Sequence, residues 1–195
     1  MWINRIGRHC ITVLAPEILI LTILFSDFNI ETDLSIISQL AASREEENDH
    51  FRAFLEARDS EVTDSMVFSL QEAVTEQIDC RQCGNCCKSL MIVVTEDELK
   101  KVAAITHSTP DDFKSQHLAE GLSGKLIMNS IPCHFLSDRQ CTIYDHRFAG
   151  CREFPALHLP GFTARYFTVQ MHYARCPIIF NVVELLKKEL SFFTT

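Results

Sequence analysis

Eight cysteines between residues 80 and 176 constrain the fold of this chain more than any other feature. Four stand close together, and the full set is Cys80, Cys83, Cys86, Cys87, Cys133, Cys141, Cys151 and Cys176. Such a density predicts either a disulfide scaffold or metal ligation. A ninth cysteine, Cys10, lies in an apolar stretch and is expected to be a bystander, because buried free cysteine behaves as a small hydrophobic residue.

The spacing within the first cysteine group favours metal. Cysteines separated by two intervening residues can turn both sulfurs toward one ion. Gly84 removes a Cβ where the chain has to bend around that ion. Disulfides between such close cysteines would close small, strained rings, so each cysteine would need a distant partner. That pairing remains the alternative for an exported protein.

The N-terminal stretch bears on the compartment. Residues 1–28 are apolar, but Pro16, Glu17 and Asp27 interrupt them, and the longest charge-free run, Ile18 to Ser26, has nine residues. A membrane span needs about twenty residues. No small-x-small cleavage site follows the run, although a short secretory signal stays an alternative. We therefore expect a cytoplasmic protein with an N-terminal extension over residues 1–32.

Residues 33–79 are expected to form an acidic helical segment. The stretch from Glu31 to Asp79 has 13 acidic residues and three arginines, a net charge of −10. An apolar residue recurs every fourth position near its end, which predicts a helix with one apolar stripe: Val62, Met66, Leu70, Val74 and Ile78. Ser60 or Thr63 is expected to cap that helix.

Residues 80–195 are expected to form a cysteine-cluster metal-binding domain with short strands. Apolar, β-branched runs predict strands at 90–94, 125–129 and 163–170. Helices are predicted after the capping box Thr95–Glu98, after Thr109-Pro110, and over 177–190. The predicted fold class is α+β: a small cysteine-rich domain, preceded by the acidic helices and closed by a C-terminal helix.

The type of metal is not fixed by the spacing. Zinc takes paired Cys-x-x-Cys hooks, and iron–sulfur clusters take Cys-x-x-Cys-x-x-Cys with a remote Cys-Pro, here Cys176-Pro177. We favour a [4Fe-4S] cluster, with zinc as the alternative. One partition assigns Cys80, Cys83, Cys86 and Cys176 to one centre and Cys87, Cys133, Cys141 and Cys151 to another. His134 and His146 lie nearest in sequence and could substitute as ligands, although a packing role is the commoner one.

Five stretches carry a resemblance to a known family. They are 80–87 (CRQCGNCC), 133–136 (CHFL), 141–147 (CTIYDHR), 151–155 (CREFP) and 176–177 (CP). Together they resemble the CxxCxxCC family, also called YkgJ-type cysteine cluster proteins, with a zinc- or iron-chelating domain. The resemblance covers about residues 79–190. One departure is Phe148, where family members carry proline, and we expect it to alter the local turn.

The resemblance also bears on activity. The family is similar to flagellin lysine N-methylases, and its members are often labelled iron–sulfur oxidoreductases. If the chain is an enzyme, the resemblance therefore implies an oxidoreductase or a methyltransferase-like activity. A methylase would be expected to carry additional sequence. We expect a bound metal or cluster with redox or group-transfer chemistry, against a zinc-stabilised interaction module or a metal carrier.

Two arginines are candidates for contact with the cofactor. Arg147 and Arg152 lie near cysteines in the sequence, and guanidinium groups can donate hydrogen bonds to thiolate sulfurs and offset their charge. Arg152, directly beside Cys151, is the stronger candidate, although both arginines could instead pair with neighbouring carboxylates. The aromatic residues Tyr144 and Phe154 are expected to be core residues.

Charge limits the possible partners. The acidic segment is a poor match for nucleic acid, and residues 80–195 have 11 acidic and 13 basic residues with no basic stripe. We therefore expect no nucleic-acid partner and no membrane partner. The acidic helices could offer a surface to another protein.

Overall fold

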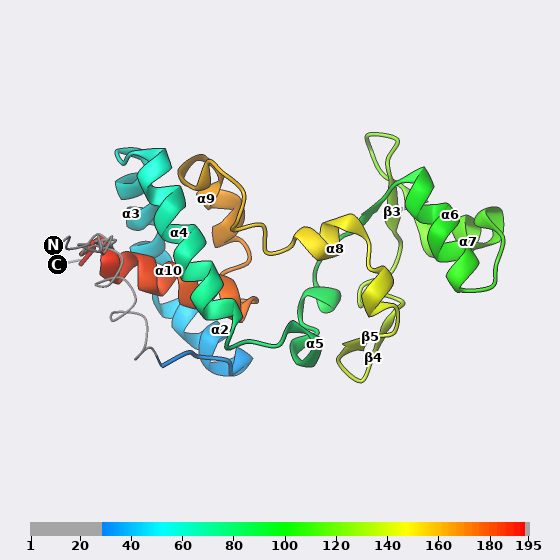
Figure 1. Ribbon diagram of the computed structural model, residues 1–195, viewed down its shortest axis with the longest axis horizontal. Helices are drawn as coiled ribbons and strands as arrows, with labels where there is room; N and C mark the ends of the chain where they lie inside the picture. Colours follow the sequence, from blue (N-terminus) through cyan, green and yellow to red (C-terminus); the bar gives the residue numbers. More distant parts are fainter. Residues whose placement is uncertain (1–28, 194–195) are drawn as a thin grey trace, which may run out of the picture.

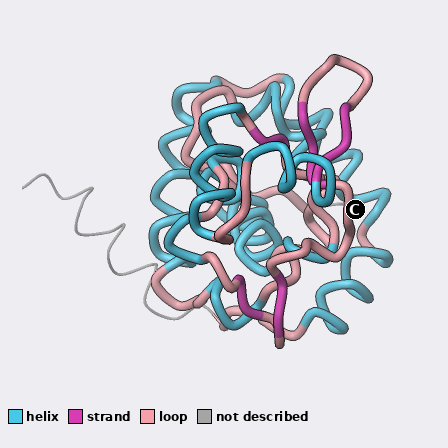
Figure 2. Tube along the Cα trace, turned by 90° about the vertical axis from the view of Figure 1, so that its right-hand side faces the viewer, coloured by secondary structure: helices cyan, strands magenta, loops and turns pink. Residues whose placement is uncertain are grey.

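A computed structural model describes residues 29–193, and Cys10 and most of the predicted N-terminal extension lie outside them. The predicted α+β class is confirmed: helices dominate, with a few short antiparallel strands. Figure 1 shows an elongated molecule with helices gathered at one end and a smaller group of helices and strands at the other. Figure 2, turned by 90°, shows how short the strands are beside the helices.

Five helices form the helical lobe, which comprises residues 30–79 and 157–192. They are α2 (Leu34–Ser43), α3 (Glu45–Glu56), α4 (Ser60–Thr75), α9 (Phe162–Gln170) and α10 (Pro177–Glu189). Their apolar faces share one core, in which Phe51, Leu70, Tyr166 and Leu186 are fully buried. The predicted C-terminal helix is therefore confirmed as α10, and it packs against α4 and α2.

Helix α4 corrects two details of the sequence prediction. Its N-cap is Asp59, whose carboxylate accepts hydrogen bonds from the backbone N–H groups of residues 61 and 62, so the choice of Ser60 or Thr63 was wrong. The stripe is also rotated: Val62 is 56% exposed, while Val67 is fully buried. A period of 3.6 residues drifts away from a strict spacing of four, which explains the rotation.

Residues 162–170 form helix α9, so the predicted strand over 163–170 was wrong. Aromatic and β-branched residues favoured the strand. Phe162, Tyr166 and Val169 are buried at helical spacing instead. The buried Asp64 carboxylate of α4 accepts hydrogen bonds from the backbone N–H groups of Gly161 and Phe162. A carboxylate at this position stabilises the first turn of a helix.

The sheet lobe comprises residues 89–151 and has a core of its own. Its helices are α6 (Glu96–Ile105) and α7 (Pro110–His117), and its sheet has β1 (Val93–Val94), β2 (Leu118–Glu120) and β3 (Leu126–Met128) in the order β1-β3-β2, all antiparallel. The predicted capping box of α6 and the strands near 90–94 and 125–129 are confirmed. Phe113 and Val102 are among its buried residues.

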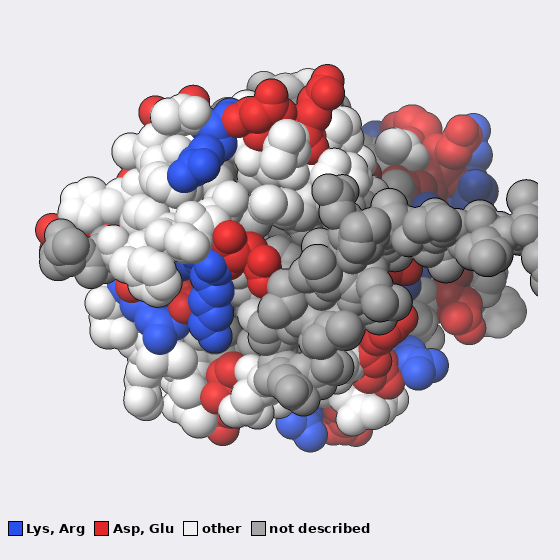
Figure 3. Space-filling view, turned by 60° about the vertical axis from the view of Figure 1, so that its left-hand side comes forward, with Lys and Arg blue, Asp and Glu red and all other residues white. Residues whose placement is uncertain are grey.

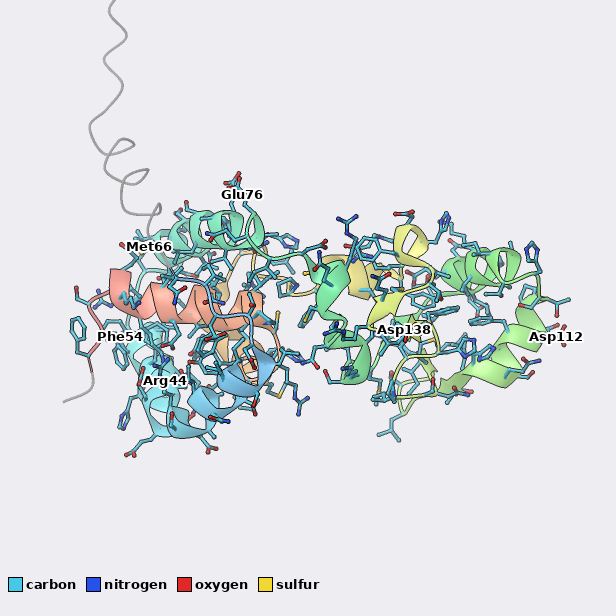
Figure 4. All side chains as sticks on the ribbon, turned by 90° about the horizontal axis from the view of Figure 1, so that it is seen from below. Arg44, Phe54, Met66, Glu76, Asp112 and Asp138 are labelled. Atoms are coloured by element: carbon cyan, nitrogen blue, oxygen red, sulfur yellow. The ribbon has the colours of Figure 1, made fainter. Side chains whose placement is uncertain are left out.

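A junction of residues 80–88 and 152–156 connects the two lobes. It holds the short helix α5 (Cys80–Cys83), the 3₁₀ turn Cys86–Lys88 and the end of α8 (Ala149–Glu153). The hairpin β4 (Leu136–Ser137) and β5 (Gln140–Cys141) approaches it from the sheet lobe. In Figure 4, Asp138 of this hairpin lies in the middle of the molecule, whereas Glu76 lies in the helical lobe and Asp112 at the opposite end.

The two cores group the chain differently from the predicted segments. The acidic helices α2 to α4 share their core with α9 and α10, which come from the predicted cysteine-cluster domain. The boundaries at residues 32 and 79 remain predictions about independent units. Within residues 29–193, no helix is long and apolar enough to cross a membrane.

Candidate metal centre

All eight cysteines of residues 80–176 line one cavity between the lobes. Its volume is about 90 Å³, several times the roughly 10–15 Å³ that one water molecule needs. Apolar walls come from both lobes, including Ile78 and Ile178 on one side and Phe135 and Ile143 on the other. Cysteines far apart in the sequence therefore meet at the junction.

The first cysteine group forms a compact turn. The Asp79 side chain caps α5, and Gly84 ends it with φ of 59°. A Cβ on Gly84 would lie 2.1 Å from the carbonyl oxygen of Arg139, so this glycine is needed both for its backbone angle and for the close approach of the β4–β5 hairpin. The predicted bend at Gly84 is therefore present, with the hairpin as its neighbour.

Asn85 joins this turn to the helical lobe. Its Nδ2 donates a hydrogen bond of 2.7 Å to the carbonyl oxygen of Arg175, the residue before Cys176. Sequence reasoning passed over Asn85. Its place between Cys83 and Cys86 was the available signal, since a polar side chain inside a ligand loop is suited to fixing that loop.

The second cysteine group comes from a loop, a hairpin and a short helix of the sheet lobe. The backbone N–H of Cys133 donates to the carbonyl oxygen of Cys87 over 2.7 Å, which ties the two groups together. Cys141 ends the hairpin, whose turn residues Asp138 and Arg139 both have positive φ, as a two-residue hairpin of this type requires. Cys151 lies in α8, and all three half-buried cysteines pack against the core of the sheet lobe.

Cys176 comes from the helical lobe and is the one fully buried cysteine among the eight. It is the N-cap of α10, so its sulfur faces the backbone N–H groups of Ile178 and Ile179. Burial raises the pKa of Cys176 to about 12 in spite of these two donors. A metal ion would have to displace that proton, as it does for any thiol ligand.

Electrostatic coupling sorts the sulfurs into two neighbourhoods. The thiols of Cys80 and Cys83 add to burial in raising the pKa of Cys176, which places these three together. Burial is also the main reason that the pKa of Cys151 is raised to about 12, and the thiols of Cys133, Cys86 and Cys141 add to the increase. Cys86 is coupled to Cys80 as well, so it belongs to both neighbourhoods.

Cys86 and Cys87, adjacent in the chain, both line the cavity and influence each other's protonation. A hydrogen bond from Cys87 lowers the pKa of Cys86 to about 7. The same hydrogen bond raises the pKa of Cys87, and burial adds to that increase. Cys86 is therefore the sulfur that most readily becomes a thiolate, the form that binds metals.

The structure brings Arg147, and not Arg152, to the cavity. The Arg147 guanidinium lies 3.6 Å above the ring of Tyr144, and its Nε is buried with no hydrogen-bond partner among the described residues. Arg152 is exposed and donates to the carbonyl oxygen of Arg147 instead. Arg81, Arg139 and Arg175 also line the cavity, and no Asp or Glu of residues 29–193 does.

The histidine at the cavity is His172, which sequence reasoning missed. His172 precedes Cys176 by four residues, its carbonyl oxygen accepts the Cys176 N–H, and its ring packs edge-on against Phe154. Burial lowers the pKa of its imidazole. The predicted candidates lie elsewhere: His134 stacks on His117 with ring centroids 4.0 Å apart, and His146 is exposed outside the lining.

The donor set fits a thiolate-bound metal or cluster. Eight thiols share one cavity with four arginines, and thiolate is the ligand preferred by zinc and by iron–sulfur clusters. Over the described residues, no three Cys, His, Asp or Glu side chains converge closely enough to hold a single ion. The cysteines thus surround a shared space and do not close on one point.

A comparison with protein families agrees with this geometry. A model of the CxxCxxCC family, described as "Putative zinc- or iron-chelating domain", matches residues 79–177, just over half of the chain. The chain belongs to the CxxCxxCC family. The CxxCxxCC domain holds all eight cysteines of the cavity, and this membership supports binding of zinc or iron. No curated protein and no solved structure matched the chain.

The resemblance to the CxxCxxCC family led to two expectations, one about the turn at Phe148 and one about related proteins. Phe148 has φ of −57°, an angle that proline also adopts, and its ring is 3% exposed in the core of the sheet lobe. The backbone angle therefore gives no sign of the altered turn that we expected. The relation to YkgJ-type proteins and flagellin lysine N-methylases stays a prediction.

Proposed function

We propose that this chain is a metal protein whose cysteines hold an iron–sulfur cluster, [4Fe-4S], in the cavity between the lobes. The observation that carries the proposal is the meeting of all eight cysteines in one cavity lined by four arginines. Such a cluster would supply one-electron chemistry when bound.

The size of the cavity supports a cluster over a single ion. A zinc ion draws four sulfurs to about 2.3 Å from one point. The eight cysteines instead surround a cavity of about 90 Å³. A cluster of several atoms suits sulfurs that are spread around a volume.

The proposal assigns the ligands as the sequence suggested. Cys80, Cys83, Cys86 and Cys176 hold the cluster, and the remaining four cysteines, Cys87, Cys133, Cys141 and Cys151, hold a second metal. Coupling of Cys176 to Cys80 and Cys83, and of Cys151 to Cys133 and Cys141, supports this assignment. Cys86 and Cys87 are adjacent in the chain, so one peptide bond links the two centres.

In this proposal Arg147 offsets the negative charge of the thiolates. Its charge acts on the thiols of Cys80, Cys86 and Cys151, in each case lowering the sulfur's pKa against the effect of burial. The unpartnered Nε is free to donate to a thiolate. Arg152, which lies outside the cavity, has the lesser role of holding the Arg147 backbone.

Zinc is the second candidate, favoured by the Cys80-x-x-Cys83 turn that ends in left-handed Gly84. In that case the metal would stabilise the fold without redox chemistry. Both versions place the protein in the cytoplasm, where thiols stay reduced. Neither calls for nucleic acid: on the face drawn in Figure 3, acidic and basic side chains lie among one another without a basic surface.

Anaerobic purification followed by iron, sulfide and zinc analysis tests the proposal. A brown protein with broad visible absorption and equal amounts of iron and sulfide is expected. A colourless protein with zinc and no sulfide would contradict the cluster and support the second candidate. Cys83→Ala should lose the iron, while Cys10→Ala, at the cysteine outside both groups, should retain it.

The role of Arg147 needs a separate pair of variants. Arg147→Gln removes a positive charge from the cavity, which raises the pKa of the thiols. On acidification, the variant should therefore lose its metal at a higher pH than the unmodified protein. Arg152→Gln removes an equal charge from outside the cavity and serves as the matched control. Equal shifts in the two variants would show that Arg147 acts only through the net charge of the protein.

A further inference from the structure

The two lobes of this protein have separate hydrophobic cores. Residues of α2, α3, α4, α9 and α10 make up one core, and residues 92–148 make up the other, with no residue in common. Apart from the contact of α5 with β5, the most extensive contacts between elements fall within one lobe. Figure 1 shows the lobes at opposite ends, with α5 and α8 between them.

Over residues 29–193, no hydrogen bond or ion pair runs from the helical lobe to the sheet lobe. The polar contacts that link the lobes indirectly pass through the junction. The side-chain amide of Asn85 contacts the helical lobe. The carbonyl oxygen of Cys87 contacts the sheet lobe, and Gly84 lies against a backbone carbonyl of that lobe. Residues 80–88 thus touch both sides.

The cysteines follow the same division. Cys176 belongs to the helical lobe, where it begins α10. Cys133, Cys141 and Cys151 pack on the core of the sheet lobe. The other four lie in the junction segment between them: Cys80, Cys83, Cys86 and Cys87.

From this arrangement we infer that the metal centre is the joint of the molecule, meaning the part that fixes the orientation of the two lobes relative to each other. The inference rests on the proposed function, since it needs bound metal. The centre that includes Cys176 fixes the junction segment to the helical lobe. The centre that includes Cys133, Cys141 and Cys151 fixes the same segment to the sheet lobe. Metal loading therefore sets the orientation of the two lobes.

Through this joint, the metal content controls how freely the two lobes move relative to each other. Loss of the metal leaves two stretches of chain and a few polar contacts between the lobes, so their relative motion increases while the core of the helical lobe persists. Acidic helices and cysteine loops that are held in one arrangement with metal are then free to separate. Local freedom of this kind follows from the low density of contacts at the junction.

Small-angle X-ray scattering and hydrogen exchange on the full chain, with metal and after chelation under reducing conditions, test the joint. Chelation is expected to increase the radius of gyration. Exchange should rise about tenfold or more in residues 80–91 and 152–156 while the buried amides of α4 and α10 stay protected. An unchanged radius and unchanged exchange after measured metal loss would overturn the inference, and so would unfolding of both lobes together.

Two variants separate the joint from its surroundings. Cys176→Ser removes the helical-lobe ligand and should increase exchange at the junction without affecting the sheet lobe. Asn85→Ala removes the amide contact to Arg175 and, in the metal-loaded protein, should leave the radius unchanged. A larger radius in Asn85→Ala with full metal content would show that the polar contact is the joint. A chain that takes up no metal would overturn the proposed function, and the joint with it.

Discussion

The helical lobe and the sheet lobe are held together by different means. The helical lobe has five helices around a large core and a buried ionic group in which Lys187 contacts Glu47 and Glu184. The sheet lobe has strands of two or three residues, two short helices and a smaller core. Small units of this kind commonly need a metal or disulfides to fold. The comparison indicates that the metal matters for stability on one side of the molecule.

Removing the second metal should have the largest effect. Cys141→Ala takes a ligand from the hairpin of the sheet lobe, and structural metal sites contribute on the order of 10 kcal/mol to small domains. We expect loss of protection from hydrogen exchange in α6, α7 and the three-stranded sheet, with the helical lobe still folded. Metal analysis and hydrogen exchange on the same sample would check this. If the sheet lobe stays protected from hydrogen exchange without metal, the two lobes do not differ in their need for metal.

The buried ionic group should be next in size. Lys187 is 4% exposed, and its Nζ lies 2.6 Å from Glu47 and 2.9 Å from Glu184. Lys187→Ala leaves two half-buried carboxylates with less compensation, at a cost of about 3 kcal/mol, the low end of the range for a buried pair. Urea unfolding of the helical lobe would measure it. Lys188→Ala, at the exposed neighbour, is the control and should change little. Equal losses in both variants would contradict the role of the pair.

The contact between α4 and α9 offers a smaller test within the same lobe. Asp64 accepts two backbone hydrogen bonds at the start of α9, and Asp64→Ala would leave both N–H groups without their partner. We expect a loss of about 3 kcal/mol in the free energy of unfolding, because each bond to a charged group is worth about 1.5–3 kcal/mol. Glu72→Ala on the exposed side of α4 is the control, and metal content should be unchanged in both.

The sequence predicted the parts of this molecule that depend on local patterns. The capping box at Thr95, the closing helix after Pro177 and the turn at Gly84 are signals carried by a few neighbouring residues. The cysteine spacing likewise predicted one metal-binding module, and all eight cysteines line one cavity. These features were accessible because their physical cause lies within a few residues of each other.

Features that depend on distant contacts were beyond the sequence. Helix α9 looked like a strand because its helical start is fixed by Asp64, about a hundred residues earlier. An apolar stripe on a helix does not identify the element that covers it, so the packing of α10 against the acidic helices was missed. The place of His172 beside the cavity follows from that same packing, whereas His134 lies away from the cavity against His117.

The junction itself provides the smallest and most local test. Gly84 has φ of 59°, and a Cβ there would meet the Arg139 carbonyl, so Gly84→Ala strains the turn between Cys83 and Cys86. The left-handed angle alone costs about 1–2 kcal/mol for a residue with a side chain, and metal affinity should fall about tenfold or more. A competition titration with a chelator would measure the fall. Gly150→Ala, where a Cβ meets nothing within 4 Å beside Cys151, is the matched control and should bind metal normally. If both variants bind equally well, the close approach of the hairpin to the first cysteine group does not shape the metal centre.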